Sequence, residues 1–374
     1  MEYVRLGDVL SVNRGKRLTK TQLSDDGKYF VYHGSKDTPL GKYSQFNVKG
    51  KTTIVVNTGG IGGVKFCDEN FWCSDGSFWI GHSSLLNDKY VYYYLSPKES
   101  YFASQKRVGG VPTIDRSTVE NVEIPVPPLP VQEEIVRILD AFTELQAELQ
   151  AELQKRLQQY NYYRDNLLSF EGRTDVQWKK LGKIASITTG RRFVRTDIRE
   201  SGVPCFHYGD IYTYYGLTAT KTKGYLDEEL AKKLRFAQPN DVVVVCAGEN
   251  DMDIGVGVAW LGDEPAVVHD ACCILHHNQS PRYISHFLRT PNYHLQMKKY
   301  VKNGKISSLP ASGLAEALIP LPSLEEQERI ASILDRFDSL TNDLTSGLPA
   351  EIEKRRQQYE YYRDKLLTFK RKEA

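Results

Sequence analysis

The sequence predicts a mixed α/β protein made of two domains of like fold, each followed by a long helical region. Two long internal repeats are the main basis for this prediction. Lys155–Phe170 (KRLQQYNYYRDNLLSF) returns as Lys354–Phe369 (KRRQQYEYYRDKLLTF), with 12 of 16 positions identical. Just upstream, Ile124–Phe142 matches Ile319–Phe337 at 11 of 19 positions.

A third, shorter repeat marks the start of each copy. Residues 6–17 begin with Leu-Gly and end with Gly-Lys-Arg, and residues 181–192 begin with Leu-Gly and end with Gly-Arg-Arg. Between these matched edges the two copies differ almost completely. We therefore expect two unlike heads, residues 1–123 and 173–318, alternating with two like helical regions, residues 124–172 and 319–374.

Composition describes an ordinary soluble globular protein. The chain has 374 residues, 40% hydrophobic and 26% charged, with a formal net charge of +2. No apolar run approaches the roughly 18 residues of a membrane span, and the start of the chain does not resemble a signal peptide. The six cysteines form no CxxC pair. Reduced core thiols and a cytoplasmic location are the expectation.

The first head reads as strands and glycine loops. Thr52–Asn57 is a β-branched run that stops at a glycine loop, residues 58–63. Phe71–Ile80 alternates polar and large apolar residues, which predicts one half-buried strand. Lys89–Leu95 fits a strand or a helix end equally well. In the second head, Asp241–Val245 and Val267–Leu275 are the expected counterparts of the two strands.

Residues 131–170 contain neither proline nor glycine and predict a single helix of about 40 residues, about 60 Å long. Its apolar residues alternate three and four apart, as in a coiled coil, and residues 143–154 are three tandem units, TELQ, AELQ and AELQ. A helix of this length needs a partner, so we expect the two helical regions to pack as an antiparallel coiled coil with a pseudo-two-fold arrangement. Ser346-Gly347-Leu348-Pro349 predicts a break in the second region and a new helix start at Pro349.

This geometry favours DNA as the ligand. Two heads on a pseudo-two-fold rod present themselves to two half-sites, as a dimeric DNA reader does. Because the heads differ, the site would be bipartite and asymmetric. One four-residue unit changes the helix length by about 6 Å, which is close to two base-pair rises of about 3.4 Å. The tandem units would therefore set the distance between the half-sites.

At these motifs the chain resembles the specificity subunit of a type I restriction–modification system, a prokaryotic defence system. The resemblance covers essentially the whole chain. It depends on the proline-rich exit before Gln132 and Gln327, the two YYRDxLLxF endings and the TELQ/AELQ units.

The resemblance implies that each head is a target recognition domain for one half of a double-stranded DNA site. It also implies that the helices dock two modification subunits, which carry adenine methyltransferase chemistry and use S-adenosylmethionine. Restriction subunits, which use ATP and Mg, would join through them. The chain itself would be non-catalytic and would bind no cofactor. The second helical region is four residues longer between Phe337 and Tyr359 than the first is between Phe142 and Tyr160, so we do not expect the two docking surfaces to be strictly equivalent.

Candidate DNA contacts are basic or polar residues near glycines at equivalent places in the two heads. Basic turns suit phosphate contact, and Lys, Arg, Asn, Ser and Thr side chains pair with base edges. Solvated surface turns are the alternative interpretation. The candidates are Lys16, Arg17, Thr58, Gly59, Lys106, Arg107 and Thr113 in the first head, and Arg191, Arg192, Asn250, Lys302, Asn303, Lys305, Ser307 and Ser308 in the second.

The repeated Tyr/Arg clusters and the glutamines before them predict either the seam between the helices or a surface that docks a partner subunit, since Tyr and Arg favour interface hot spots. These residues are Gln132, Tyr160, Tyr163, Arg164, Gln327, Tyr359, Tyr362 and Arg363.

Catalytic interpretations are weaker. His269-Asp270, Cys272-Cys273 and His276-His277 crowd nine residues, but strand alternation would aim them at opposite faces, so packing is favoured over a metal site. The sequence has no GxGxxG between a strand and a helix and no [N/D/S]PP[Y/F] stretch. Two alternatives to the DNA specificity subunit stay open: a coiled-coil scaffold with two protein-binding heads, and a self-contained DNA-modifying enzyme.

Overall fold

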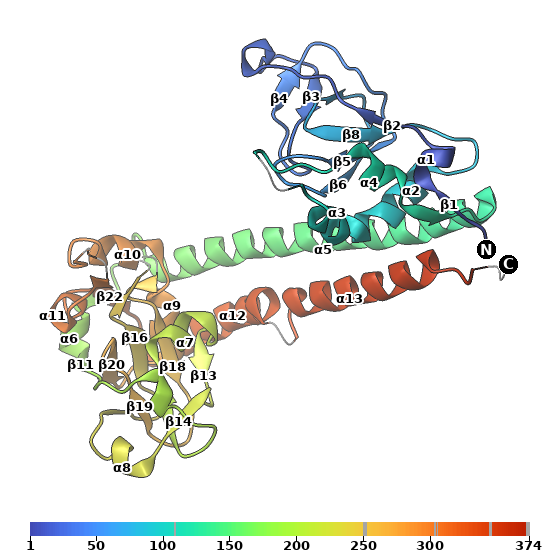
Figure 1. Ribbon diagram of the computed structural model, residues 1–374. Helices are drawn as coiled ribbons and strands as arrows, with labels where there is room; N and C mark the ends of the chain where they lie inside the picture. The colour runs from blue at the N-terminus through green and yellow to red at the C-terminus, as the bar shows by residue number, and fades with distance from the viewer. Residues whose placement is uncertain (108–109, 250–252, 303, 305, 344–345, 372–374) are drawn as a thin grey trace. The chain divides into compact units, whose positions relative to one another are not determined.

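The computed structural model describes residues 1–107, 110–249, 253–302, 304, 306–343 and 346–371. The chain folds into two compact units (Figure 1). Unit 1 comprises Met1–Glu148 and Lys354–Ala374, and unit 2 comprises Leu149–Glu353. Each unit contains one head, the start of the helical region that follows that head, and the end of the other helical region.

The first head is built on two small sheets. The four-stranded antiparallel sheet has the order β2 (Val12–Arg14), β8 (Ser77–Ile80), β5 (Thr52–Val56) and β6 (Val64–Cys67). The three-stranded sheet has the order β4 (Gly41–Tyr43), β3 (Tyr29–Tyr32) and β7 (Trp72–Cys73). A separate pair joins β1 (Tyr3–Arg5) to β9 (Glu123–Pro125). The helices of this head are α1 (Leu6–Val9), α2 (Asp88–Leu95), α3 (Glu99–Ser104) and α4 (Arg116–Glu120).

The second head is also built on two sheets, and each of them has one more strand than its counterpart in the first head. Its larger sheet has the order β11 (Ala185–Thr189), β20 (Cys272–His277), β16 (Val242–Val245), β18 (Gly257–Trp260) and β13 (Thr218–Ala219). Its second sheet has the order β14 (Gly224–Leu226), β12 (Val203–Phe206), β19 (Ala266–Val268) and β15 (Phe236–Ala237). Two separate pairs join β10 (Gln177–Lys180) to β22 (Leu318–Leu321) and β17 (Ala247–Gly248) to β21 (Ser307–Ser308).

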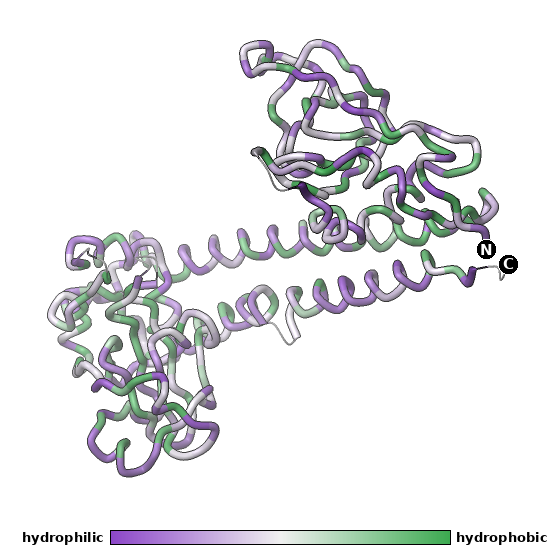
Figure 2. The backbone as a smooth tube through the Cα atoms, in the orientation of Figure 1, coloured by the Kyte–Doolittle hydropathy of each residue, from purple (hydrophilic) through white to green (hydrophobic). Residues whose placement is uncertain are grey.

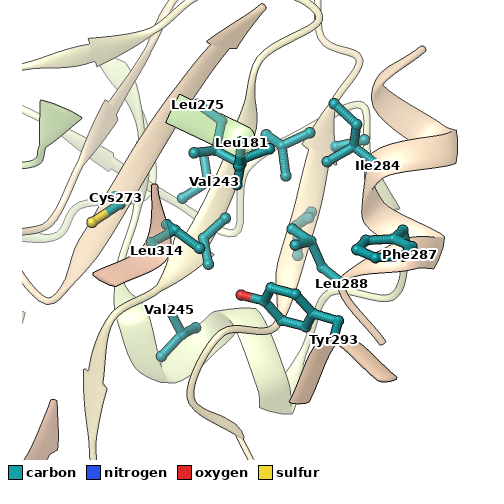
Figure 3. Packing of buried hydrophobic residues seen from close by; sticks show 14 of the residues in the cluster. Leu181, Val243, Val245, Cys273, Leu275, Ile284, Phe287, Leu288, Tyr293 and Leu314 are labelled. Atoms are coloured by element: carbon teal, nitrogen blue, oxygen red, sulfur yellow. The ribbon is translucent and has the colours of Figure 1, made fainter. Parts of the chain in front are cut away.

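Short helices complete the second head: α6 (Leu181–Ile184), α7 (Tyr208–Thr213), α8 (Glu228–Ala231), α9 (Pro281–Phe287), α10 (Pro291–Met297) and α11 (Ala311–Leu314). Its core forms where α9 covers the valine-rich β16. Val243, Leu275 and Ile284 lie in one buried cluster there (Figure 3). Burying a side chain of this size stabilises the fold by about 1.5–3 kcal/mol.

The prediction of one half-buried strand over Phe71–Ile80 is wrong. The segment forms β7 and β8, which belong to different sheets and are separated by a turn at Ser74–Gly76. Most of its residues are buried on both faces, because each strand lies between packed layers. Val267–Leu275 divides in the same way between β19 and β20. Lys89–Leu95 is helical, and the Asn87 side chain caps α2 by accepting from the backbone N–H groups of Lys89 and Tyr90.

The long helix is confirmed. The first helical region is one helix, α5 (Leu129–Ser169). The second region divides into α12 (Leu324–Asn342) and α13 (Leu348–Leu367), so the break is confirmed and the new helix begins one residue before Pro349. Hydrophobic and hydrophilic residues alternate along α5, whereas α13 is mostly hydrophilic between its two ends (Figure 2). Among the described residues, no helix has the length and apolar character needed to cross a membrane.

Within each unit the two helices pack antiparallel. In unit 1, Phe142 of α5 stacks on Tyr362 of α13, with ring centroids 5.6 Å apart. The start of α5 and the end of α13 line one apolar groove. In unit 2, Tyr163 near the end of α5 stacks on Phe337 of α12 at 5.3 Å. The expectation of antiparallel helix pairing is confirmed within the units.

Candidate nucleic-acid interface

The basic turn of the first head is held close to the turn between β7 and β8. The backbone N–H of Gly15 donates to the Ser77 carbonyl at 3.1 Å, and that of Lys16 donates to the Cys73 carbonyl at 2.9 Å. A Cβ on Gly15 would lie 2.2 Å from the Ser74 carbonyl oxygen, so the close approach requires glycine. The Lys16 and Arg17 side chains remain exposed.

The second head repeats this arrangement with different residues. The backbone N–H of Gly190 donates to the Cys272 carbonyl at 2.9 Å, and that of Arg191 donates to the Val268 carbonyl at 3.0 Å. A Cβ on Gly190 would lie 2.2 Å from the His269 carbonyl oxygen. Arg191 and Arg192 are exposed, and the Arg191 guanidinium also donates to the Lys233 carbonyl.

The predicted glycine loop and polar loop meet in both heads. In the first head, Thr113 forms β-bridges with both Thr58 and Arg107. The N–H of Ile114 donates to the Asn57 carbonyl at 3.0 Å. These bonds bring the two loops, which lie about 50 residues apart in the sequence, to the end of β5.

In the second head, Ser308 pairs with Ala247 through β17 and β21 and bridges to Lys302. The N–H of Leu309 donates to the Cys246 carbonyl at 2.8 Å, which is the counterpart of the Ile114 bond. The two loops therefore have one backbone frame in both heads, although only a few of their side chains agree.

The loops also meet the turns that hold the basic residues. The Asn57 N–H donates to the Gly76 carbonyl at 3.0 Å in the first head, and the Cys246 N–H donates to the Ala271 carbonyl at 2.8 Å in the second. The backbone N–H of Gly60 donates to the Gly34 carbonyl at 2.8 Å. Each head thus gathers its basic turn, glycine loop and polar loop at one end of its larger sheet.

The candidate side chains differ in how exposed they are and in whether they pair with other side chains. Lys106 and Lys302 are exposed, Thr58 and Thr113 are half-buried, and Gly59 is exposed with φ +76°. Arg107 is exposed but forms an ion pair with Asp115. Ser308 is half-buried. Ser307 is 4% exposed, so its side chain belongs to the loop packing and not to a reading surface. Asn250, Asn303 and Lys305 lie outside the described residues.

The structure adds histidines that the sequence prediction missed. His33 follows β3, and its Nδ1 accepts the Gly76 N–H at 3.1 Å, so in the neutral ring the proton is on Nε2. His207 follows β12 and packs on His269, with ring centroids 4.8 Å apart. Burial lowers the pKa of both His207 and His269. The signal was present in the sequence, because His33 and His207 each follow an aromatic residue and lie 174 positions apart, nearly the 175 that separate the short repeats at the start of each copy.

The repeated Tyr/Arg clusters lie where the helices of each unit meet, and in unit 2 Tyr160 also faces the head, with its hydroxyl 3.4 Å from His286 Nδ1 on α9. In unit 2, Tyr160 is 5% exposed, and the Arg164 guanidinium lies 5.6 Å from its ring centroid. In unit 1, Arg363 lies 5.7 Å from the ring of Tyr359. Tyr163 and Tyr362 make the stacked seam contacts described above. The tyrosine just before each stacked one points outward: the Tyr162 side chain is 66% exposed and the Tyr361 side chain is 61% exposed.

Gln132 and Gln327 occupy neither the seam nor a docking surface. Both side chains are fully buried where each helix begins beside its own head. Their amides bond to groups of that head, so the expectation that they contact a partner subunit needs correction.

The side chains of the histidine- and cysteine-rich segment in the second head do not converge on one site. His276 faces Asp241 at 2.7 Å, Cys272 and Cys273 are buried in β20, and His269 lies in the turn before it. Burial lowers the pKa of His277 to about 4. Among the described residues, no group of three His, Cys, Asp or Glu side chains is placed to hold a metal.

Comparison with known proteins agrees with the duplicated architecture. The family model for the type I restriction modification DNA specificity domain matches residues 1–159 and again residues 174–354. The chain is 34% identical over 351 residues to the EcoR124I/EcoR124II specificity subunit of Escherichia coli, covering 90% of this chain and 80% of that one. It is 28% identical over 400 residues to a putative type I restriction enzyme specificity subunit of Haemophilus influenzae, covering 99% and 96%.

A solved structure shows the same fold. The S subunit of a type I restriction–modification system from M. genitalium superposes with a TM-score of 0.66 at 17% identity, covering 99% of this chain and 96% of that chain. The chain belongs to the family of type I restriction–modification DNA specificity subunits.

Proposed function

We propose that this chain selects the DNA sequence on which a type I restriction–modification complex acts, and that each head reads one half of a bipartite, asymmetric double-stranded site. The observation that carries the proposal is the backbone frame shared by the two heads. It presents a basic turn beside two paired loops in each head, while most of the side chains on that frame differ. Like frames with unlike side chains suit two unlike half-sites.

The residue types support DNA as the ligand. Exposed Lys16, Arg17, Arg191 and Arg192 stand on turns anchored by backbone hydrogen bonds, which suits contact with phosphates. The loops beside them carry Lys106, Arg107 and Lys302 together with half-buried hydroxyl groups that suit base edges. Positioning contacts and reading contacts therefore lie at the same end of each head.

The helices supply spacing and assembly in this proposal. The tandem units lie within the continuous helix α5, so the number of units sets the distance between half-sites. The exposed faces around Tyr162 and Tyr361 dock two modification subunits, which transfer the methyl group of S-adenosylmethionine to adenine. Restriction subunits, with ATP and Mg, join through the modification subunits. The chain itself is non-catalytic and acts in the cytoplasm.

A variant with Arg17, Arg107, Arg192 and Lys302 all changed to Gln tests the DNA assignment. DNA affinity of the complex with its modification subunits is measured by fluorescence anisotropy, and folding by circular dichroism. The proposal predicts loss of DNA binding with unchanged folding. Lys179→Gln is the matched control, because this exposed lysine lies on β10, paired to β22, away from the loops. Unchanged affinity in the fourfold variant would instead favour a scaffold with two protein-binding heads.

A further inference from the structure

Each head is attached to its own helix by a polar clamp with the same design in both units, made of a fully buried amide and a partly exposed carboxylate. In unit 1 the clamp consists of Gln132 and Asp140 on α5 with Asn87, Lys89 and Tyr93 of the head. In unit 2 it consists of Gln327 and Asp335 on α12 with Ser280, Arg282 and His286. The spacing is identical in the two copies: eight residues separate the two helix groups, and the head groups follow at steps of two and four.

The first half of the clamp is a fully buried glutamine amide. The Gln132 Oε1 accepts the Asn87 N–H at 2.8 Å, and its Nε2 donates to the carbonyls of Leu85 at 2.9 Å and Pro127 at 2.7 Å. Asn87 is the N-cap of α2. The amide therefore joins the cap of a head helix to the proline-rich entry of α5.

Gln327 does the same in unit 2. Its Oε1 accepts the N–H of Ser280, the N-cap of α9, at 3.1 Å. Its Nε2 donates to the Pro322 carbonyl at 3.0 Å and to Gln279 Oε1 at 2.9 Å.

The second half is a carboxylate two turns further along the helix. Asp140 accepts from the Lys89 ammonium at 2.9 Å and from the Tyr93 hydroxyl at 2.5 Å. In unit 2, Asp335 accepts from the Arg282 guanidinium at 2.7 Å and faces the His286 Nε2 at 2.8 Å. The head residues change type between the copies, yet each carboxylate retains one cation and one neutral or titratable donor.

A joint of this kind defines a single orientation. Apolar surfaces can slide or rotate against each other at little cost. A buried amide that shifts by one ångström leaves its donors and acceptors without partners, which is unfavourable. The amide and the partly exposed carboxylate, about 12 Å apart along the helix, together oppose both rotation and tilting of the head.

We propose that this clamp is the positioning element that makes recognition selective for one spacing between the half-sites, at single base-pair resolution. The inference rests on the proposed function. One extra base pair moves a half-site by about 3.4 Å and turns it by about 35° around the DNA axis. A head fixed rigidly to its helix does not follow that displacement, whereas a loosened head does.

The test is selection from duplexes that carry the two preferred half-sites at every spacing, using the complex with its modification subunits and S-adenosylmethionine. Gln132→Leu and Gln327→Leu remove the amide at constant size. Each is expected to reduce the preference for the best spacing over its one-base-pair neighbours by about tenfold, with both half-site sequences unchanged. Gln158→Leu is the control and retains the wild-type preference, because this exposed glutamine lies on α5 outside the tandem units of residues 143–154.

Asp140→Asn keeps the shape of the second contact and serves where a leucine variant does not fold. It is expected to broaden the spacing preference in the same direction. Weaker binding with an equally sharp spacing preference would overturn the clamp as a positioning element, since it would then contribute only to stability. A wild-type complex that selects no bipartite site would refute the proposed function, and the clamp inference would fall with it.

Discussion

Substitution of Gly190 by alanine tests the frame that presents the basic turn of the second head. The added Cβ would lie 2.2 Å from the His269 carbonyl oxygen and 2.3 Å from that of Val268. Ordinary contacts of this type exceed 3 Å, so the turn must move by about 1 Å. Overpacking of this kind costs about 1–3 kcal/mol, and loss of the bond from the Arg191 N–H to the Val268 carbonyl adds about 1 kcal/mol.

The total of about 2–4 kcal/mol corresponds to a fall in Tm of about 5–15 °C for a unit of roughly 200 residues. Gly216→Ala is the matched control in the same head, because a Cβ there meets no atom of the described residues within 4 Å. Differential scanning calorimetry compares the two variants. In DNA selection, Gly190→Ala should weaken the half-site of the second head and leave the other half unchanged. Equal Tm values for the two variants would refute the packing argument.

Three further predictions follow from the helices, the charges and the buried histidine. Deleting Ala151–Gln154 removes about 6 Å of α5 and should shorten the preferred spacing by about two base pairs without changing either half-site. Sequencing of the selected duplexes measures the spacing. An unchanged spacing would contradict the role of the tandem units. Arg192→Gln should weaken binding to all sequences alike and reduce the slope of log affinity against log salt by about one, whereas a change confined to one base position would indicate base reading. Burial lowers the pKa of His277 from 6.5 to about 4, so the unfolded chain takes up a proton at a higher pH than the folded one. The stability that this neutral histidine contributes is present above pH 6.5 and is lost as the pH falls from 6.5 to 4, about 3 kcal/mol in all. His277→Asn, which retains an acceptor for the Gln279 N–H, should flatten urea-unfolding free energy across that window, and an unchanged slope would show that other groups dominate.

The repeats made the architecture predictable because they report directly on duplicated structure. The length of α5 and the break near Gly347 followed from where proline and glycine are absent or present. The strand over Phe71–Ile80 was mispredicted for a physical reason: alternation along one segment does not reveal that a three-residue turn transfers the chain to another sheet. That transfer depends on partner strands β3 and β5, which are distant in sequence.

The candidate site was predictable where backbone chemistry leaves a mark in the sequence. The basic turns were found because basic residues follow a glycine at equivalent places in the two copies, and the structure shows that close approach requires that glycine. Gln132 and Gln327 were assigned to the helix seam or a docking surface because a polar residue at the start of a charged helix gives no sign of burial beside a head. Their burial depends on Asn87 and Ser280, which reach them from about 45 residues away. His33 was missed because its function in the frame depends on a hydrogen bond from Gly76.

The central claim is that two unlike heads on a shared frame read one bipartite DNA site. The most direct test is selection from a random-sequence duplex library, with and without the modification subunits and S-adenosylmethionine. The account predicts enriched sites with two unlike half-sites at one fixed spacing. Enrichment of a single continuous motif, or of no sequence under either condition, would contradict it.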